Sequence, residues 1–532
     1  MTGCGGGSTG SSGGSTGSSG EAPSSSGTGN LAGDSAVPEG ARLAEHINII
    51  NNESQLTIVN PMSAAGTGGP SAWANILVYD RLLSETEPGV FAPMLATEWH
   101  TDDYQTFTFK LRNDVYFHNG DHFTANDVVW MCEITKETPA SPTFSRWNII
   151  DTITAIDDYN LKIVLKEPYM DYFLDVSRNN YCILNRTAYN KNPDDPTWAF
   201  IGTGPFKIAG FESNNYITFE RFDDYWGEAP PTKSMTFWTV PEMSTRIVKL
   251  KNKEAQVSFQ MPPEDLDIIS KDPDFQLFPI LINEPGILGF NDQGDATITD
   301  KNFRLAVAHA IDSEETTLVA LGNWGTVPWD GNLWGPDTQF RLEGLAKREY
   351  NLDLAKEYLA KSPYKGETLE IITSSPHNTK AAEVVQMQLE RIGVKTNIQQ
   401  MDHAAIIAAL IWDPDSKVQM HTFAMPMSPI VSSVMSSHTS RPNNRLNFAD
   451  PLLYEIANKY KGTADVKERE ELAHQLQEHW YELIPAIPLF YRLQPVTTVK
   501  GIGGLKLYSD VFIHNMRGIY WDLNQTPANM IP

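Results

Sequence analysis

The sequence predicts an α/β protein with more than one lobe, and three observations lead to this prediction. The chain has 532 residues, several times the roughly 100 to 200 of one typical domain. Its first half is rich in strand patterns, such as the alternation of apolar and polar residues over 106–112. Beyond Asn291 helix patterns at 303–311, 352–359 and 381–392 alternate with strand patterns at 368–373 and 394–399. Such alternation is typical of an α/β lobe.

The strand-rich half is expected to contain two hairpins. One pairs 106–112 with 115–118, and the other pairs 153–156 with 161–165. A GTGP turn at 202–205 precedes a further strand. No internal repeat with a period of about 20 to 50 residues is visible, which disfavours solenoids and propellers.

Residues 1–40 differ in composition from the rest of the chain. The opening MTGC is followed by a Gly/Ser/Thr-rich tract that reaches about Pro38. This tract has too little apolar surface to form a core, so a flexible linker is expected. A small residue, a cysteine and a flexible tether resemble the cleavage site of a bacterial lipoprotein. Cys4 is therefore the candidate lipid-bearing residue, and the alternative is a free cysteine in a flexible tail.

The charge and the cysteine content limit the classes of partner. The formal net charge of −25 disfavours nucleic acid, which is itself an anion. No stretch approaches the roughly 20 apolar residues that cross a bilayer. For Cys132 and Cys182 two alternatives are open: a disulfide, or two unrelated buried thiols.

Several short motifs occur in order along most of the chain. They are PMLATEW at 93–99, FHNGD at 117–121, TANDVV at 124–129, GTGPF at 202–206, DYWG at 224–227, RLAVAHAID at 304–312 and QLERIGV at 388–394. Together they resemble the bacterial ABC-transporter solute-binding proteins of family 5, which includes oligopeptide-, dipeptide- and nickel-binding proteins. The resemblance runs from about residue 48 to the C-terminus.

This resemblance implies a periplasmic-binding-protein-like α/β fold, the large three-lobe variant of type II, with a hinged ligand cleft. The lobes it implies are a discontinuous first lobe at 41–84, 197–282 and 499–532, an inserted lobe at 85–196, and a second α/β lobe at 283–498. The hinge is expected near Asn283 and Val499. The resemblance also implies a monomer that delivers its solute to ABC permease subunits, held at the outer face of the membrane, or in the periplasm, by its lipid anchor.

The resemblance also suggests where a ligand binds. Peptide-binding relatives hold the solute's amino group with an aspartate that follows an aromatic residue, and Pro426 stands at that position here. Glu284 is the candidate replacement, and an ordinary surface glutamate is the alternative. The other pocket positions that can be matched are His403, Met420, Phe423, Met425 and Ile287, with core packing as the alternative for the methionines.

The segment PLFYR at 488–492 adds two candidates. Arg492 ends an apolar strand pattern and is suited to bind a carboxylate or phosphate, while Tyr491 is suited to stack on a ligand. The alternative for Arg492 is a solvated surface charge.

Catalytic patterns are missing from the sequence. His118 and His122 flank a turn, and there is no nucleophile elbow or HExxH motif. We therefore expect no enzyme activity, metal or cofactor. The expected function is to capture a peptide or peptide-like solute for an ABC importer. An oligosaccharide is the alternative ligand, and a glycoside hydrolase or a non-transport sensor module is the alternative class.

Overall fold

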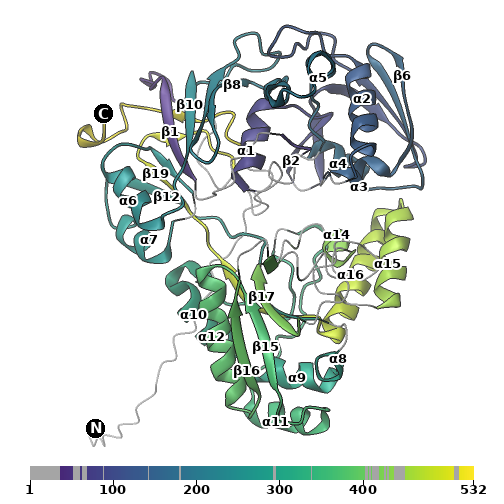
Figure 1. Ribbon diagram of the computed structural model, residues 1–532, viewed down its shortest axis with the longest axis vertical. Coiled ribbons are helices and arrows are strands. Elements are labelled where there is room, and N and C mark those ends of the chain that lie inside the picture. The colour runs from purple at the N-terminus through teal and green to yellow at the C-terminus, as the bar shows by residue number, and fades with distance from the viewer. Residues whose placement is uncertain are drawn as a thin grey trace, which may run out of the picture.

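The computed structural model describes residues 36–51, 60–62, 69–87, 89–139, 141, 143–178, 181–259, 261–291, 295–336, 338–401, 405–406, 409, 418–424, 427, 430–435, 450–507 and 515–531. They form two bodies, one above the other in Figure 1, and the chain passes between them twice.

The first body contains a mixed sheet and the helices α1 (Gly69–Val78), α6 (Met243–Lys251) and α7 (Pro263–Ile269). In the described part of the chain its strand order is β12 (Phe275–Phe278), β19 (Val496–Val499), β11 (Val257–Ser258), β1 (His46–Asn51), β10 (Ser234–Thr239), β9 (Tyr216–Arg221) and β8 (Phe206–Glu212). Because side chains alternate along a strand, Ile49 and Ile50 of β1 enter separate cores. The Ile49 core contains Trp73 of α1, and the Ile50 core contains Leu250 of α6.

A second, antiparallel sheet extends the first body. Its order is β4 (Ala96–His100), β5 (Thr106–Leu111), β7 (Asn160–Leu165) and β6 (Ile150–Asp157). Beside it lie the ladder β2 (Leu83–Glu87) with β3 (Val90–Pro93) and the helices α2 (Ala125–Lys136), α3 (Phe144–Asn148), α4 (Tyr172–Ser177) and α5 (Arg186–Lys191). Phe107 and Phe109 of β5 belong to the same core as Ile49, so the two sheets share one core.

One of the two predicted hairpins is present in the structure, and the other is not. β6 and β7 pair across residues 158–159, which confirms the second. The first is wrong: β5 pairs with β4 and β7, so both of its edges are already occupied. Tyr116 forms only an isolated bridge with His122.

The second body contains a sheet with helices on both faces. Among the described residues the order is β14 (Gly325–Thr326), β18 (Ala486–Arg492), β13 (Gly286–Phe290), β17 (Met420–Ala424), β15 (Thr368–Thr373) and β16 (Lys395–Gln400). One face carries α9 (Lys301–Ala310), α10 (Ser313–Leu321), α11 (Leu352–Lys361) and α12 (Pro376–Glu390), with α8 (Ala296–Thr299) beside α9. The other face carries α14 (Ile430–Met435), α15 (Pro451–Gly462) and α16 (Val466–Leu483).

Two of the sequence motifs contact each other in the first body. The backbone N–H of His118 donates to the Gly202 carbonyl at 2.9 Å, and its ring Nε2 lies 2.9 Å from the Gly204 carbonyl. A Cβ at Gly202 would lie 2.0 Å from the carbonyl oxygen of Val78, at the end of α1. Only glycine allows this approach, so these contacts between the two motifs have a structural role.

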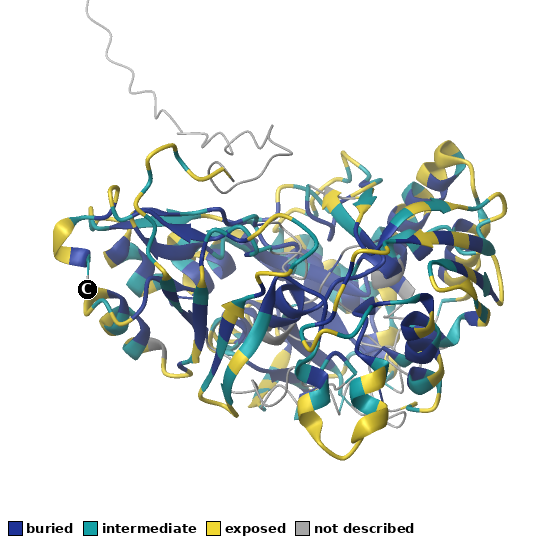
Figure 2. Ribbon diagram, turned by 90° about the horizontal axis from the view of Figure 1, so that it is seen from above, coloured by how far each residue is buried: buried dark blue, intermediate teal, exposed yellow. Residues whose placement is uncertain are grey.

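The structure decides between the two alternatives for the cysteines. Cys132 and Cys182 are two buried thiols that are not joined in a disulfide, and burial raises the pKa of the Cys182 thiol to about 12. Figure 2 shows that the buried residues concentrate in the sheets and the inner faces of the helices. In the ranges that the structure describes, no helix is long and apolar enough to cross a membrane.

Candidate functional site

The two bodies are connected by residues 279–285, between β12 and β13, and by residues 493–495, between β18 and β19. These crossing segments run antiparallel and are bonded to each other. The N–H of Ile282 donates to the Arg492 carbonyl at 3.0 Å, and the N–H of Gln494 donates to the Ile280 carbonyl at 2.8 Å. The crossing segments therefore form a narrow two-stranded ribbon, close to the positions predicted for the hinge.

The cores of the two bodies are otherwise separate. The one described side chain that joins a core of the other body is Trp324, which lies against the core of α6 and α7 and donates from Nε1 to Asp267 at 3.0 Å. Two bodies with their own cores and a narrow connecting ribbon can rotate about it with little loss of apolar burial.

The edge of the second sheet nearest this ribbon has the strand topology at which open α/β sheets bind ligands. β15 is parallel to both of its neighbours, β16 and β17. From β15 the chain passes through α12 to β16 on one face of the sheet, and Ile406, between β16 and β17, packs on the opposite face with Ile372 and Phe423. Open α/β sheets bind ligands outside the carboxyl ends of their strands at a reversal of this kind, and we call this place the crevice.

Glu284 and Arg492 lie at this edge. Glu284 precedes β13 and Arg492 ends β18, and in the sheet Gly286 stands opposite both Phe490 and Ala424. Arg492 Nη2 donates to Glu284 Oε2 at 3.1 Å, and each side chain is 19% exposed. Arg492 Nε is buried, and no described residue accepts a hydrogen bond from it. Glu284 and Arg492, both predicted as site residues, thus form a half-buried ion pair. The Nε–H of Arg492 remains available to donate a hydrogen bond to a ligand.

The start of α12 lies at the same edge, directly after β15. Ser375 has φ 65° and ψ 147°, a conformation that is nearly restricted to glycine, and residues held in this way cluster at functional sites. His377 follows in the first turn, its ring against Phe490. Burial, together with the charge of Arg492, lowers the pKa of His377 to about 3, so the ring is neutral at physiological pH. The positive end of the α12 dipole and Arg492 make this corner suited to an anion.

The other predicted site residues are placed differently. Ile287 and Met420 are fully buried in the two cores of the second body. Tyr491 is 1% exposed, stacks on Trp329 and donates from its hydroxyl to the Asn332 carbonyl at 3.1 Å. None of these three presents surface to a solute in this conformation, and their role as ligand contacts stays a prediction.

Phe423 has 7% of its surface exposed and lies near the carboxyl end of β17. His403, Met425 and the substituted position Pro426 lie outside the described residues, as does Cys4. Their predicted roles stay predictions.

The sequence patterns place the start of this helix at residue 381 and so do not point to Ser375 and His377. The structure begins α12 at Pro376. A proline at the first helical position directly after a strand is a recognised helix start, and this signal was available in the sequence.

The comparisons with known proteins agree with this geometry. Residues 90–444 match the model of bacterial extracellular solute-binding proteins, family 5 Middle. The chain belongs to this family. The expected identity, a family 5 solute-binding protein of an ABC importer, and the expected periplasmic-binding-protein fold are thereby confirmed.

Similar proteins support the same assignment for this solute-binding protein. The nickel-binding periplasmic protein of Escherichia coli (strain K12) is 23% identical, over 81% of this chain and 87% of its own. The dipeptide-binding protein DppE of Bacillus subtilis (strain 168) is 25% identical, over 84% and 87%. The structure of the periplasmic binding protein DppA from Helicobacter pylori with the peptide STSA superposes with a TM-score of 0.79 at 22% identity, covering 90% of this chain and 99% of its own.

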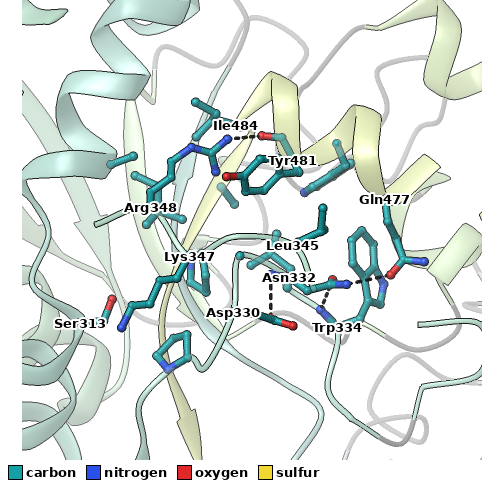
Figure 3. A pocket seen from close by; sticks show the side chains of 18 of the residues that line it. Ser313, Asp330, Asn332, Trp334, Leu345, Lys347, Arg348, Gln477, Tyr481 and Ile484 are labelled. Carbon is teal, nitrogen blue, oxygen red and sulfur yellow. Dashed lines mark hydrogen bonds between the residues drawn. The ribbon is translucent and has the colours of Figure 1, made fainter. Parts of the chain in front are cut away.

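A small cavity behind the sheet has a structural role. It is lined by residues of α16 and of the segments 328–334 and 345–348, several of which are labelled in Figure 3. Its volume is about 40 Å³. Asn332 Nδ2 donates to Gln477 Oε1 at 2.9 Å, and Arg348 Nη2 donates to the Tyr481 carbonyl at 2.6 Å. These contacts attach the two segments to α16. The space is enough for about one water molecule and too small for a solute.

The buried side chain of His421 makes the stability of this solute-binding protein depend on pH. It is 1% exposed, and neither ring nitrogen has a hydrogen-bond partner among the described residues. Burial lowers its pKa to about 4, whereas the unfolded value is about 6.5. As the pH falls below about 6.5, the unfolded state therefore takes up this proton first, and the free energy of unfolding decreases.

We expect His421→Leu to remove this contribution. At pH 8 the variant and the wild type should unfold with similar free energies, and at pH 5 the variant should gain about 2 kcal/mol relative to the wild type. Urea titrations at both pH values measure the difference. If the free energies of unfolding of the variant and the wild type differ by the same amount at pH 8 and at pH 5, His421 is not buried in its neutral form.

Proposed function

We propose that this protein binds a short peptide or peptide-like solute with free termini in the crevice between its two bodies. The observation that carries the proposal is the Glu284–Arg492 ion pair, at 3.1 Å, beside the crossing segments. The pair supplies one carboxylate and one guanidinium at the place where the two bodies meet. A zwitterionic solute requires a cation beside its carboxylate and an anion beside its ammonium, because burying either of its charges unpaired costs several kcal/mol.

The proposed roles follow from the chemistry of each group. The guanidinium of Arg492 binds the solute's carboxylate, assisted by the first-turn N–H groups of α12, which have no partners within the helix. The carboxylate of Glu284 binds the ammonium and so replaces the acid that is missing at Pro426. Neutral His377 adds a polar neighbour without adding charge to the corner.

The relatives support a peptide as the solute class. One is named as a dipeptide-binding protein, and one solved structure holds the peptide STSA. Another relative is named for nickel. The described residues of this chain hold no cluster of three or more histidine, cysteine or acidic side chains that would favour a metal ion.

The transport role completes the proposal. The first lobe (41–84, 197–282 and 499–532) with its insertion (85–196) and the second lobe (283–498) close over the solute by rotation about the crossing segments. The closed form then docks on ABC permease subunits. We propose that the protein is a monomer without catalytic activity, attached to the outer face of the membrane by a lipid on Cys4.

Calorimetry with blocked peptides tests the proposed function. Trialanine with free termini is expected to bind, while N-acetylated and C-amidated trialanine each bind at least about tenfold more weakly, because each leaves one charge of the pair unmatched. Maltotriose and Ni²⁺ serve as comparison ligands. Binding of maltotriose or Ni²⁺ without binding of any peptide would reject the proposal.

A further inference from the structure

A second cavity lies between the bodies, beside α4 of the first and α16 of the second. We call it the flank cavity; its volume is about 190 Å³. Its walls include Phe91, Phe173 and Leu174 from the first body, and Phe340, Tyr460 and Ala473 from the second. Because both bodies supply its walls, the flank cavity is complete only when they are together.

Two contacts hold the bodies together beside it. The guanidinium of Arg469 on α16 is ion-paired with Asp171, the residue before α4, and stacks over the ring of Tyr460 at 4.3 Å. The N–H of Met170 donates to the Lys461 carbonyl at 3.3 Å. These contacts define the arrangement in which the flank cavity exists.

The charged groups in the walls are already paired. Arg178 lies 3.6 Å from Glu85, with side chains 13% and 4% exposed, and Arg469 is paired with Asp171. A side chain with a single charge would have to separate one of these pairs and leave one member buried and uncompensated, whereas the two charges of a zwitterion compensate both members of a pair. The flank cavity therefore disfavours an occupant that carries a single charge.

Apart from the Gln339 side chain, the remaining walls favour an apolar ring. Phe91 and Phe173 lie with ring centroids 6.0 Å apart, and Tyr104, Phe340 and Tyr460 supply further aromatic surface. An apolar cavity of roughly 150 Å³ is large enough to bind benzene, so about 190 Å³ accommodates an aromatic side chain.

Asn283 links the flank cavity to the solute crevice. Its Oδ1 accepts from the Gly335 N–H at 2.9 Å, its Nδ2 donates to Thr338 Oγ1 at 2.8 Å, and its carbonyl accepts from the Met427 N–H at 3.2 Å. Two residues of the cavity wall lie close along the chain to these bonds. Phe340 lies two residues after Thr338, and Ile430 lies three residues after Met427. Asn283 itself precedes Glu284, so the two chain segments that lead to these wall residues are hydrogen-bonded to the neighbour of the proposed ammonium site.

We propose that the flank cavity is the specificity pocket of this protein and takes one aromatic side chain of the bound peptide. This inference rests on the proposed function, since it needs a peptide held at Glu284 and Arg492. It narrows the solute class to peptides with an aromatic residue. Peptides that carry lysine at the same position are disfavoured by the paired charges in the walls.

Isothermal titration calorimetry with tripeptides tests this inference. The ligands are trialanine and its six variants with phenylalanine or lysine at each of the three positions. One phenylalanine position is expected to improve the dissociation constant at least about tenfold over trialanine, as the burial of one ring predicts, and lysine there should give no gain. Equal affinity for trialanine and all phenylalanine peptides would overturn the inference and leave the proposed function standing. If no tripeptide binds, both are rejected.

Two variants and a matched control show whether the preference for phenylalanine arises in the flank cavity. Leu174→Trp fills the flank cavity and should abolish the gain from phenylalanine while leaving the affinity for trialanine unchanged. Leu318→Trp, at a position 67% exposed on α10, is the matched control and should keep the gain. Phe91→Ala removes a wall and should reduce the gain several-fold, which gives a second test if Leu174→Trp does not fold. A gain that persists in every folded variant would overturn the inference.

Discussion

Replacing Arg492 with alanine is expected to weaken the binding of a peptide with a free carboxylate about 100-fold. The half-buried guanidinium has one described partner, Glu284, and a buried Nε that no described residue engages. Its loss leaves the solute's carboxylate without its counter-charge, which is expected to cost about 3 kcal/mol. Calorimetry with trialanine measures the change, and thermal unfolding shows that the variant is folded.

The C-amidated peptide separates a direct contact from a structural effect. It carries no carboxylate, so its already weak affinity should change little in Arg492→Ala. Arg391→Ala, at the other end of α12, removes an arginine paired with Glu315 at 3.0 Å and should leave both peptides unaffected. Equal losses for the acid and amide peptides in Arg492→Ala would contradict the assigned contact.

Replacing Asp80 with alanine is expected to lower the free energy of unfolding of the first body by about 3 to 5 kcal/mol. Asp80 is fully buried; its Oδ1 lies 2.8 Å from Arg517 Nη1, and its Oδ2 accepts from Trp226 Nε1 at 2.8 Å. Without this carboxylate, the buried guanidinium of Arg517 keeps its charge and loses its counter-ion. Differential scanning fluorimetry should show a melting temperature roughly 10 °C lower.

Asp114→Ala is the matched control for this loss. Its carboxylate also pairs with an arginine, Arg112 at 2.7 Å, but its side chain is 53% exposed. Surface pairs contribute about 0 to 1 kcal/mol, so this variant should melt close to the wild type. If both aspartate variants melted alike, Asp80 would not be the buried counter-ion described above.

The fold was predictable because its signals are local and repeated. Helix and strand alternation after Asn291 and a chain-long series of motifs both point to the observed second body. The failed hairpin at residues 106–118 shows the limit, because the pairing partners of β5 come from residues 96–100 and 160–165. Which of several suitable strands pair depends on the shared core and not on the sequence near the turn.

The candidate site was only partly predictable. Glu284 and Arg492 were both identified, yet nothing in the sequence shows that two residues 208 positions apart form one ion pair. Alternation along a strand does imply that Tyr491 and Arg492 point to opposite faces, so only one of them was able to face the crevice. The flank cavity joins segments from both bodies and has no local signature.

A crystal structure with bound trialanine tests the central claim most directly. We expect the peptide between the two bodies, with its carboxylate within hydrogen-bond distance of Arg492 and its amino nitrogen beside Glu284. A peptide bound elsewhere, with the Glu284–Arg492 pair unchanged and out of contact with it, would contradict the proposed binding site.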